Sequence, residues 1–169
     1  AGVAVAAKLK AATQNRKIKI IGVQALNASP FVQSLKSGKP IEKTISRTIA
    51  DGIAVSKPGI ITFDLIKNHL DKLVTVSDDD IAKAVLTMLE RSKLAVEPAG
   101  AVGVAALMSG AVKLKGKTVV ILSGGNIDPL LMQKIIGSGL VAAERYTNIT
   151  VMLADRPGQL VQTAKAIAS

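Results

Sequence analysis

Three short segments carry the residue types that could form a chemical site. Residues 123–126 read Ser-Gly-Gly-Asn and follow an apolar run, so a hydroxyl lies at the expected end of a strand and Gly124 allows a ligand to approach the backbone closely. Glu97 precedes a Pro-Ala-Gly segment, where its carboxylate either faces a ligand or caps a helix. Asp51 and Gly52 form either a plain tight turn or part of the same site. Ligands of open α/β sheets bind where the strands end, which makes the segment after residue 122 the leading candidate.

Alternating strands and helices must position these segments. Short apolar runs predict strands, and longer stretches between them predict helices. The expected strands are residues 18–23, 72–76, 95–96 and 118–122, and the expected helices are residues 30–37, 59–70, 77–92, 101–109 and a helix from 128. This order predicts an α/β fold in which helices flank a parallel sheet. The pattern breaks between residues 139 and 148, so we expect one domain over residues 1–142 and a second, opening with a strand at 149–153, over residues 147–169.

The composition excludes several kinds of chemistry. The chain has no cysteine and only one histidine, His69, which excludes disulfides and cysteine-type zinc sites and would leave a Ser-His-Asp triad to rest on that histidine alone. The net charge of +10 comes from scattered basic residues with few aromatic side chains among them, which indicates a solvated surface and no nucleic-acid partner. No segment reaches the roughly 18 apolar residues of a membrane span, so we expect no membrane association and a cytoplasmic protein.

The acidic run at residues 78–80 favours helix capping over metal binding. Ser77 can accept a hydrogen bond from the backbone of Asp80, and the Asp80 carboxylate can close a capping box. All three carboxylates would lie at the positive end of the helix dipole.

Both ends of the chain are expected to be cuts through a larger protein. Residues 1–10 have the composition of a helix that is already under way, with no capping side chain before it. The helical stretch that starts at residue 159 stops without a glycine or proline.

Three motifs in a fixed order resemble one known family. Residues 48–52 (Thr-Ile-Ala-Asp-Gly), 97–101 (Glu-Pro-Ala-Gly-Ala) and 122–128 (Leu-Ser-Gly-Gly-Asn-Ile-Asp) are similar to motifs of the threonine ammonia-lyase and serine racemase family. The resemblance covers residues 1 to about 140 and implies the tryptophan synthase β-like fold of the fold type II pyridoxal-phosphate enzymes. It also implies that the phosphate-binding tetraglycine loop and the Schiff-base lysine lie upstream of residue 1.

The resemblance implies an activity and a cofactor, pyridoxal 5'-phosphate. The family deaminates L-threonine to 2-oxobutanoate and ammonia by β-elimination. By resemblance, the hydroxyl of Ser123 meets the pyridine nitrogen, Gly124 and Gly52 lie beside the cofactor through their backbones, and Glu97 supports the ring side of the pocket. A neutral hydroxyl leaves the ring a weaker electron sink than a carboxylate would, which suits β-elimination. No catalytic residue is expected within these 169 residues, so we expect this part alone to be inactive.

Two positions depart from the metal-binding relatives. Those relatives carry a glutamate at the end of the first strand and an aspartate six residues later, whereas this chain has Gln24 and Pro30. A backbone carbonyl from Ala28 alone would not hold a divalent ion. We therefore predict no metal at this site, which favours a lyase over a racemase.

The last segment resembles the start of an ACT regulatory domain. Residues 149–160 combine a strand, a turn with proline and glycine, and a helix start whose free N–H groups can receive an amino-acid ligand. The resemblance implies a partial effector site at Asp155, Arg156, Pro157, Gly158, Gln159 and Leu160. It also implies isoleucine or valine as effector of an allosteric enzyme of isoleucine biosynthesis that forms a homo-oligomer. An ordinary strand–turn–helix is the alternative.

Other functions remain open at this stage. The same scaffold serves L-serine dehydratases and serine racemases. From a different class, an amino-acid-sensing or nucleic-acid-binding domain would make the tail or the basic charge the functional feature. A Rossmann nucleotide binder is disfavoured because no Gly-x-Gly-x-x-Gly follows the first strand.

Overall fold

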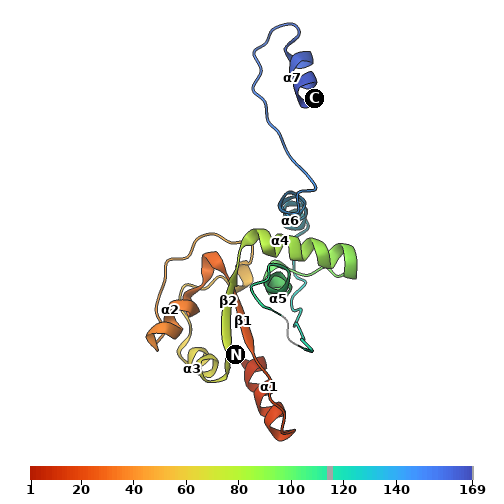
Figure 1. The fold of residues 1–169 in the computed structure, drawn as a ribbon. Helices are drawn as coiled ribbons and strands as arrows, with labels where there is room; N and C mark the ends of the chain where they lie inside the picture. The colour runs from red at the N-terminus through yellow and green to blue at the C-terminus, as the bar shows by residue number, and fades with distance from the viewer. Residues whose placement is uncertain (114–115, 169) are drawn as a thin grey trace.

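The computed structural model describes residues 1–113 and 116–168, and Figure 1 shows its elements in order. The helices are α1 (Gly2–Thr13), α2 (Pro30–Ser37), α3 (Ile60–His69), α4 (Asp78–Thr87), α5 (Pro98–Met108), α6 (Pro129–Ala142) and α7 (Gln159–Ala168). The strands are β1 (Ile21–Ala25) and β2 (Lys72–Val76). Two 3-10 turns, η1 (Leu26–Ala28) and η2 (Asp51–Ile53), and a π-helical turn, η3 (Met88–Ser92), complete the described elements.

The two strands are parallel, as the alternation of strand and helix predicted. Their register pairs Ile21 with Lys72 and Ala25 with Val76. Helices α2 and α3 lie on one side of the pair, and α4 and α5 lie on the other (Figure 1). Helix α5 contacts both strands. A parallel sheet covered by helices on both faces is the arrangement in which strands rich in valine and isoleucine are stable.

Helix α4 lies at the centre of the core, between α5 and α6. Its inward face buries Ile81 and Val85 completely, and Ile135 of α6 and Ala105 of α5 meet this face. Small side chains let the three helices approach closely, because an alanine or glycine at the contact keeps the axes near the short end of the usual packing distance. Among the described helices, none is long and apolar enough to cross a membrane.

The predicted capping box is confirmed. Ser77 Oγ accepts a hydrogen bond from the backbone N–H of Asp80 at 3.1 Å, and Asp80 Oδ2 accepts one from the backbone N–H of Ser77 at 3.3 Å. The predicted helix at 77–92 is α4 followed by the π-helical turn η3, after which Lys93 adopts a left-handed conformation that ends it.

Three of the predicted strands are not strands in the described structure. Residues 95–96, 118–122 and 149–153 form no strand ladder with any described residue. Val119 is 89% exposed, although residues 118–122 were expected to form a strand of the sheet. Apolar β-branched composition favours a strand only where a neighbouring strand supplies hydrogen bonds and a face to pack on, and the described part of the chain supplies none here.

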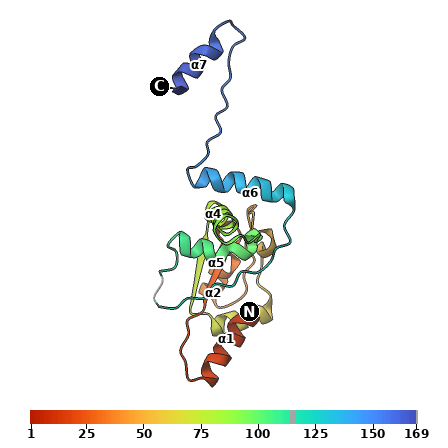
Figure 2. The same cartoon turned by 90° about the vertical axis from the view of Figure 1, so that its right-hand side faces the viewer.

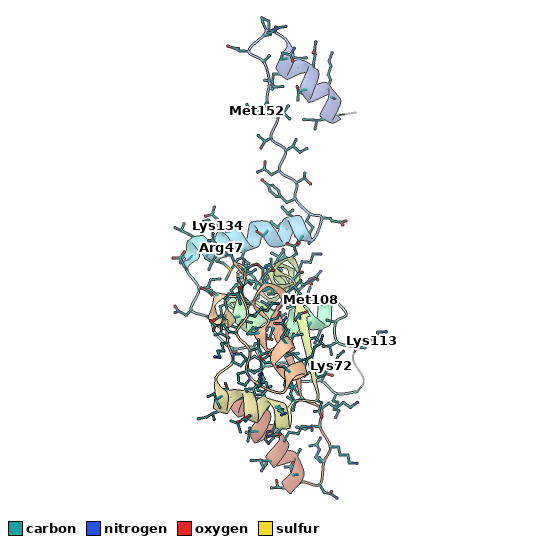
Figure 3. The ribbon with its side chains drawn as sticks, turned by 90° about the vertical axis from the view of Figure 1, so that its left-hand side faces the viewer. Arg47, Lys72, Met108, Lys113, Lys134 and Met152 are labelled. Carbon is teal, nitrogen blue, oxygen red and sulfur yellow. The ribbon has the colours of Figure 1, made fainter. Side chains whose placement is uncertain are left out.

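The tail lies apart from the other elements. Residues 143–158 lead away from α6, and α7 lies at the far end of this segment (Figure 2). Met152, labelled on the same segment in Figure 3, is 93% exposed. The division into domains at residues 1–142 and 147–169 remains a prediction, because no contact or comparison tests it.

Replacing either of two glycines of α6 with alanine should change the free energy of unfolding, and the two changes should have opposite signs. A Cβ on Gly139 would lie 2.8 Å from the carbonyl oxygen of Ala82 in α4, whereas a Cβ on Gly137 would meet nothing within 4 Å. Gly139→Ala should therefore lower the free energy of unfolding by about 1–3 kcal/mol through overpacking. Gly137→Ala should raise it by about 0.5–1 kcal/mol through helix propensity. Denaturant unfolding of both variants checks this, and equal effects would contradict the packing of α6 on α4.

The ion pair between Lys8 and Asp71 should make stability depend on pH. Lys8 Nζ donates to Asp71 Oδ2 at 2.7 Å, and the backbone N–H of Ile20 donates to the same oxygen at 2.6 Å. The hydrogen bond from Lys8, followed by that from Ile20, lowers the pKa of Asp71. The stabilisation is therefore complete above the unfolded carboxyl's pKa of about 3.9 and is lost as the pH falls through the lower folded value.

Asp71→Asn should destabilise the fold at neutral pH by less than about 1 kcal/mol, since the pair is partly exposed. The difference from wild type should shrink as the pH falls through the lowered pKa of the folded Asp71 carboxyl. Asp64→Asn, at an exposed position of α3, is the matched control. A difference between wild type and Asp71→Asn that persists in acid would contradict the role of the charge.

Candidate functional site

The three segments singled out in the sequence meet at one cavity. The cavity has a volume of about 680 Å³ and lies where η2, the N-terminus of α5 and the N-terminus of α6 converge. Its lining residues are Asp51, Gly52, Glu97, Pro98, Asn126, Ile127, Asp128, Pro129 and Leu131. The sequence order of these segments gives no direct indication of this proximity, which arises from the packing of α5 and α6 on α4.

Glu97 lies between the two glycines of the predicted site. Its backbone N–H donates to the carbonyl oxygen of Gly124 at 3.1 Å. Gly124 has a φ of +86°, and a Cβ there would overlap the Glu97 carboxylate. A Cβ on Gly52 would lie 3.2 Å from Ala99 Cβ and 3.7 Å from Glu97 Oε1. Gly124 therefore lets the backbone approach this carboxylate more closely than any other residue would allow, and the tight contact at Gly52 is with Ala99.

The carboxylate of Glu97 is not used as a helix cap. Glu97 occupies the N-cap position of α5, but its side chain makes no capping hydrogen bond. The capping alternative considered for this residue is therefore wrong. The carboxylate, on a half-buried residue, lines the cavity instead.

The backbone of Ser123 packs directly against helix α5. A Cβ on Gly100 of α5 would overlap the carbonyl oxygen of Ser123, and a Cβ on Gly103 would lie 2.7 Å from Val120 Cγ1. These glycines let the segment before Gly124 lie directly against α5. Ser123 itself is exposed and does not line the cavity, although it immediately precedes Gly124. The structure thus brings Gly52, Glu97 and Gly124 together and leaves Ser123 at their edge.

The sequence did not point to Asp128 as a site residue, and it pointed to Asn126 only as part of the candidate segment 123–126. Asp128 Oδ1 accepts hydrogen bonds from the backbone N–H groups of Leu130 and Leu131 at 2.9 and 3.0 Å, so it caps α6 while it lines the cavity. Asn126 presents an amide to the same cavity. The sequence signal for Asp128 was the Asp-Pro helix start, which predicted the cap and not its position at the site.

The predicted effector residues lie on the tail. The turn predicted from proline and glycine is present, because Gly158 has a φ of +88° and α7 begins at the next residue. Residues 155–158 and Leu160 are exposed, and none of residues 155–160 lines the cavity. Their binding role remains a prediction.

Gln24 ends up buried at the end of β1. It is 8% exposed, and its Oε1 has no hydrogen-bond partner among the described residues. It lines a second cavity of about 360 Å³. The described residues contain no cluster of three acidic, histidine or cysteine side chains that could hold a metal ion. The predicted absence of a metal at this position remains a prediction.

Comparisons with known proteins show the family of the chain. The family model described as pyridoxal-phosphate dependent enzyme matches residues 1–125. The L-threonine ammonia-lyase of Geobacter sulfurreducens is 47% identical over 152 residues, which cover 89% of this chain and 38% of that protein. The L-threonine ammonia-lyase of Thermotoga maritima is 42% identical over 168 residues, which cover 99% of this chain and 41% of that protein. Maize serine racemase has a similar structure, with a TM-score of 0.68, 32% identity and coverage of 79% of this chain and 42% of that one.

The chain spans about two-fifths of the length of these relatives. The structural similarity confirms the α/β, fold type II architecture that the motifs predicted. Since the family model matches well over half of its 169 residues, the chain belongs to the family of pyridoxal-phosphate-dependent enzymes.

Proposed function

We propose that the whole protein is an L-threonine ammonia-lyase that converts L-threonine to 2-oxobutanoate and ammonia. The observation that carries the proposal is that Gly52 and Glu97 line one cavity and that Gly124 lies against the Glu97 carboxylate, in a chain of this enzyme family. Two relatives that are named L-threonine ammonia-lyase, at 47% and 42% identity, support this substrate.

The residues present fit pyridoxal phosphate. Gly124 leaves no side chain against the Glu97 carboxylate, Gly52 adds none to the cavity wall, and the cavity beside them has a volume of about 680 Å³. Gly52 and Gly124 would lie along the ring through their backbones, Glu97 would face its edge, and Ser123 would meet its nitrogen. When bound, the cofactor withdraws electrons from the substrate's Cα, so that the proton there becomes acidic and the β-hydroxyl can leave.

The residues of this chain would orient the cofactor and attract its negatively charged groups, and they would not react with the substrate themselves. The Ser123 hydroxyl is neutral, so it orients the ring without holding a proton on the ring nitrogen as a carboxylate would. The N-termini of α5 and α6 both open on the cavity, and their dipoles favour the negatively charged groups of a substrate and cofactor. We expect residues 1–169 alone to be inactive, as the sequence predicts.

The tail would carry regulation. Residues 147–169 would be the start of an ACT-like module, with Asp155, Arg156, Gly158 and Gln159 contributing to a site for isoleucine or valine between copies of the enzyme. The turn before α7 supports this proposal, because the free N–H groups at a helix start suit an amino-acid carboxylate.

A serine-directed activity is the second candidate. The similarity to maize serine racemase favours it, since a structure of that name covers 79% of this chain. Gln24 and Pro30, which replace the expected acidic ligands, favour a lyase over a racemase within this alternative.

The substrate proposal is tested on the intact protein. Loaded with pyridoxal phosphate, it should form 2-oxobutanoate from L-threonine with a higher kcat/KM than it forms pyruvate from L-serine. Formation of D-serine at a comparable rate would instead support a racemase. An intact protein that binds no pyridoxal phosphate would contradict the proposal outright.

Ser123→Ala should lower kcat with little change in overall stability. Loss of one hydrogen bond to the ring, worth about 1–1.5 kcal/mol, corresponds to roughly a ten-fold loss of rate. Ser109→Ala, at the exposed end of α5, is the control and should leave kcat unchanged. Steady-state kinetics and the absorbance of the bound cofactor check this, and unchanged values for Ser123→Ala would remove Ser123 from the site.

A further inference from the structure

Asp78, the first residue of α4, holds the loop that reaches the cavity. The Thr48 hydroxyl donates to Asp78 Oδ1 at 2.5 Å, and the backbone N–H of Ile49 donates to Asp78 Oδ2 at 3.1 Å. The backbone N–H of Ala50 in turn donates to Thr48 Oγ1 at 3.2 Å. One carboxylate therefore fixes three consecutive residues that lie about thirty positions earlier in the chain.

This network is buried where it meets the loop. Thr48 is 9% exposed and Ala50 is fully buried. Hydrogen bonds to a charged carboxylate are stronger than neutral ones, and a buried hydroxyl left without its partner costs free energy. The loop is therefore held in one conformation at this point.

The helix that carries Asp78 gives the loop a rigid reference. Helix α4 is packed between α5 and α6, and these two helices also contribute residues to the lining of the cavity. Its capping is performed by Ser77 and Asp80, so Asp78 is not needed as a cap. Asp79 is exposed.

The held loop continues directly into the cavity wall. Residues 48–50 lead into η2, and the first two residues of η2, Asp51 and Gly52, line the cavity. Neither Thr48 nor Asp78 lines it. A shift of the loop would move Gly52 relative to Glu97, whose Oε1 would lie 3.7 Å from a Cβ on that glycine.

We propose that Asp78 and Thr48 are positioning residues for the cofactor, which act by holding Asp51 and Gly52 at their distance from Glu97. The inference rests on the proposed function, because it takes the cavity as the cofactor site. Neither residue touches the cofactor in this account, and both act only through the backbone of residues 49–52.

Four variants of the intact protein test this role. Thr48→Val removes the hydroxyl and keeps the shape, and Thr48→Ser keeps the hydroxyl. Asp78→Asn keeps the shape and replaces one of the two acceptor oxygens with a donor, so that it can no longer accept from both the Thr48 hydroxyl and the Ile49 N–H. Asp79→Asn removes a charge at the same helix end without touching the loop, and is the matched control.

The readouts are titration of the apo-protein with pyridoxal phosphate, followed by its absorbance, and amide hydrogen exchange of residues 48–53. Thr48→Val and Asp78→Asn should each weaken cofactor affinity roughly ten-fold or more and speed exchange in that segment. Thr48→Ser should recover most of both properties. Asp79→Asn should match wild type.

Two outcomes would overturn the inference. The first is a Thr48→Val protein with wild-type cofactor affinity and wild-type exchange at residues 48–53. The second is a loss of affinity that Thr48→Ser does not rescue or that Asp79→Asn shares. If Asp78→Asn does not fold, the comparison of Thr48→Val with Thr48→Ser alone tests the inference. If wild type binds no cofactor, the proposed function fails. Amide hydrogen exchange of residues 48–53 in Thr48→Val and Thr48→Ser then still shows whether the hydroxyl holds the loop.

Discussion

The close approach of residues 120–124 to the N-terminal half of α5 is the constraint on which the site depends. Gly100 leaves no room for a Cβ beside the carbonyl of Ser123, and Gly103 leaves none beside Val120. Because the segment lies against the helix backbone, Gly124 reaches the Glu97 carboxylate and Glu97 donates its N–H to the Gly124 carbonyl. An ordinary side chain at Gly100 would push Ser123 and Gly124 away from Glu97, and the two halves of the site would separate.

Helix α4 connects the other walls of the cavity to the same core. Its apolar face packs against α5 and α6, whose N-termini open on the cavity, and Asp78 at its own N-terminus holds the loop before η2. The site is thus built at helix starts and held loops, while the buried residues behind it, such as Ile81 and Ile135, keep the helices in place. Elements that share one packed core move little relative to one another, which suits a site that must present several groups to a flat ligand.

The sequence predicted the elements whose patterns are local. The capping box at Ser77, the Asp-Pro start of α6 and the alternation that produces parallel strands all follow from neighbouring residues, and the structure confirms them. The strand expected at 118–122 failed because strand formation needs a hydrogen-bonding neighbour, which composition does not reveal. Asp78 was interpreted only as part of an acidic helix start, because its contact with Thr48 spans thirty residues and leaves no local signal. The three site motifs were found by their order and resemblance, and the cavity that joins them required the fold.

The most direct measurement of the central claim is a crystal structure of the intact protein with pyridoxal phosphate bound. The account predicts the pyridine ring along the backbones of Gly52 and Gly124, with Glu97 facing its edge and its nitrogen within hydrogen-bonding distance of the Ser123 hydroxyl. Density for the ring elsewhere in the protein, with Glu97 facing solvent, would contradict the assignment of this cavity as the cofactor site.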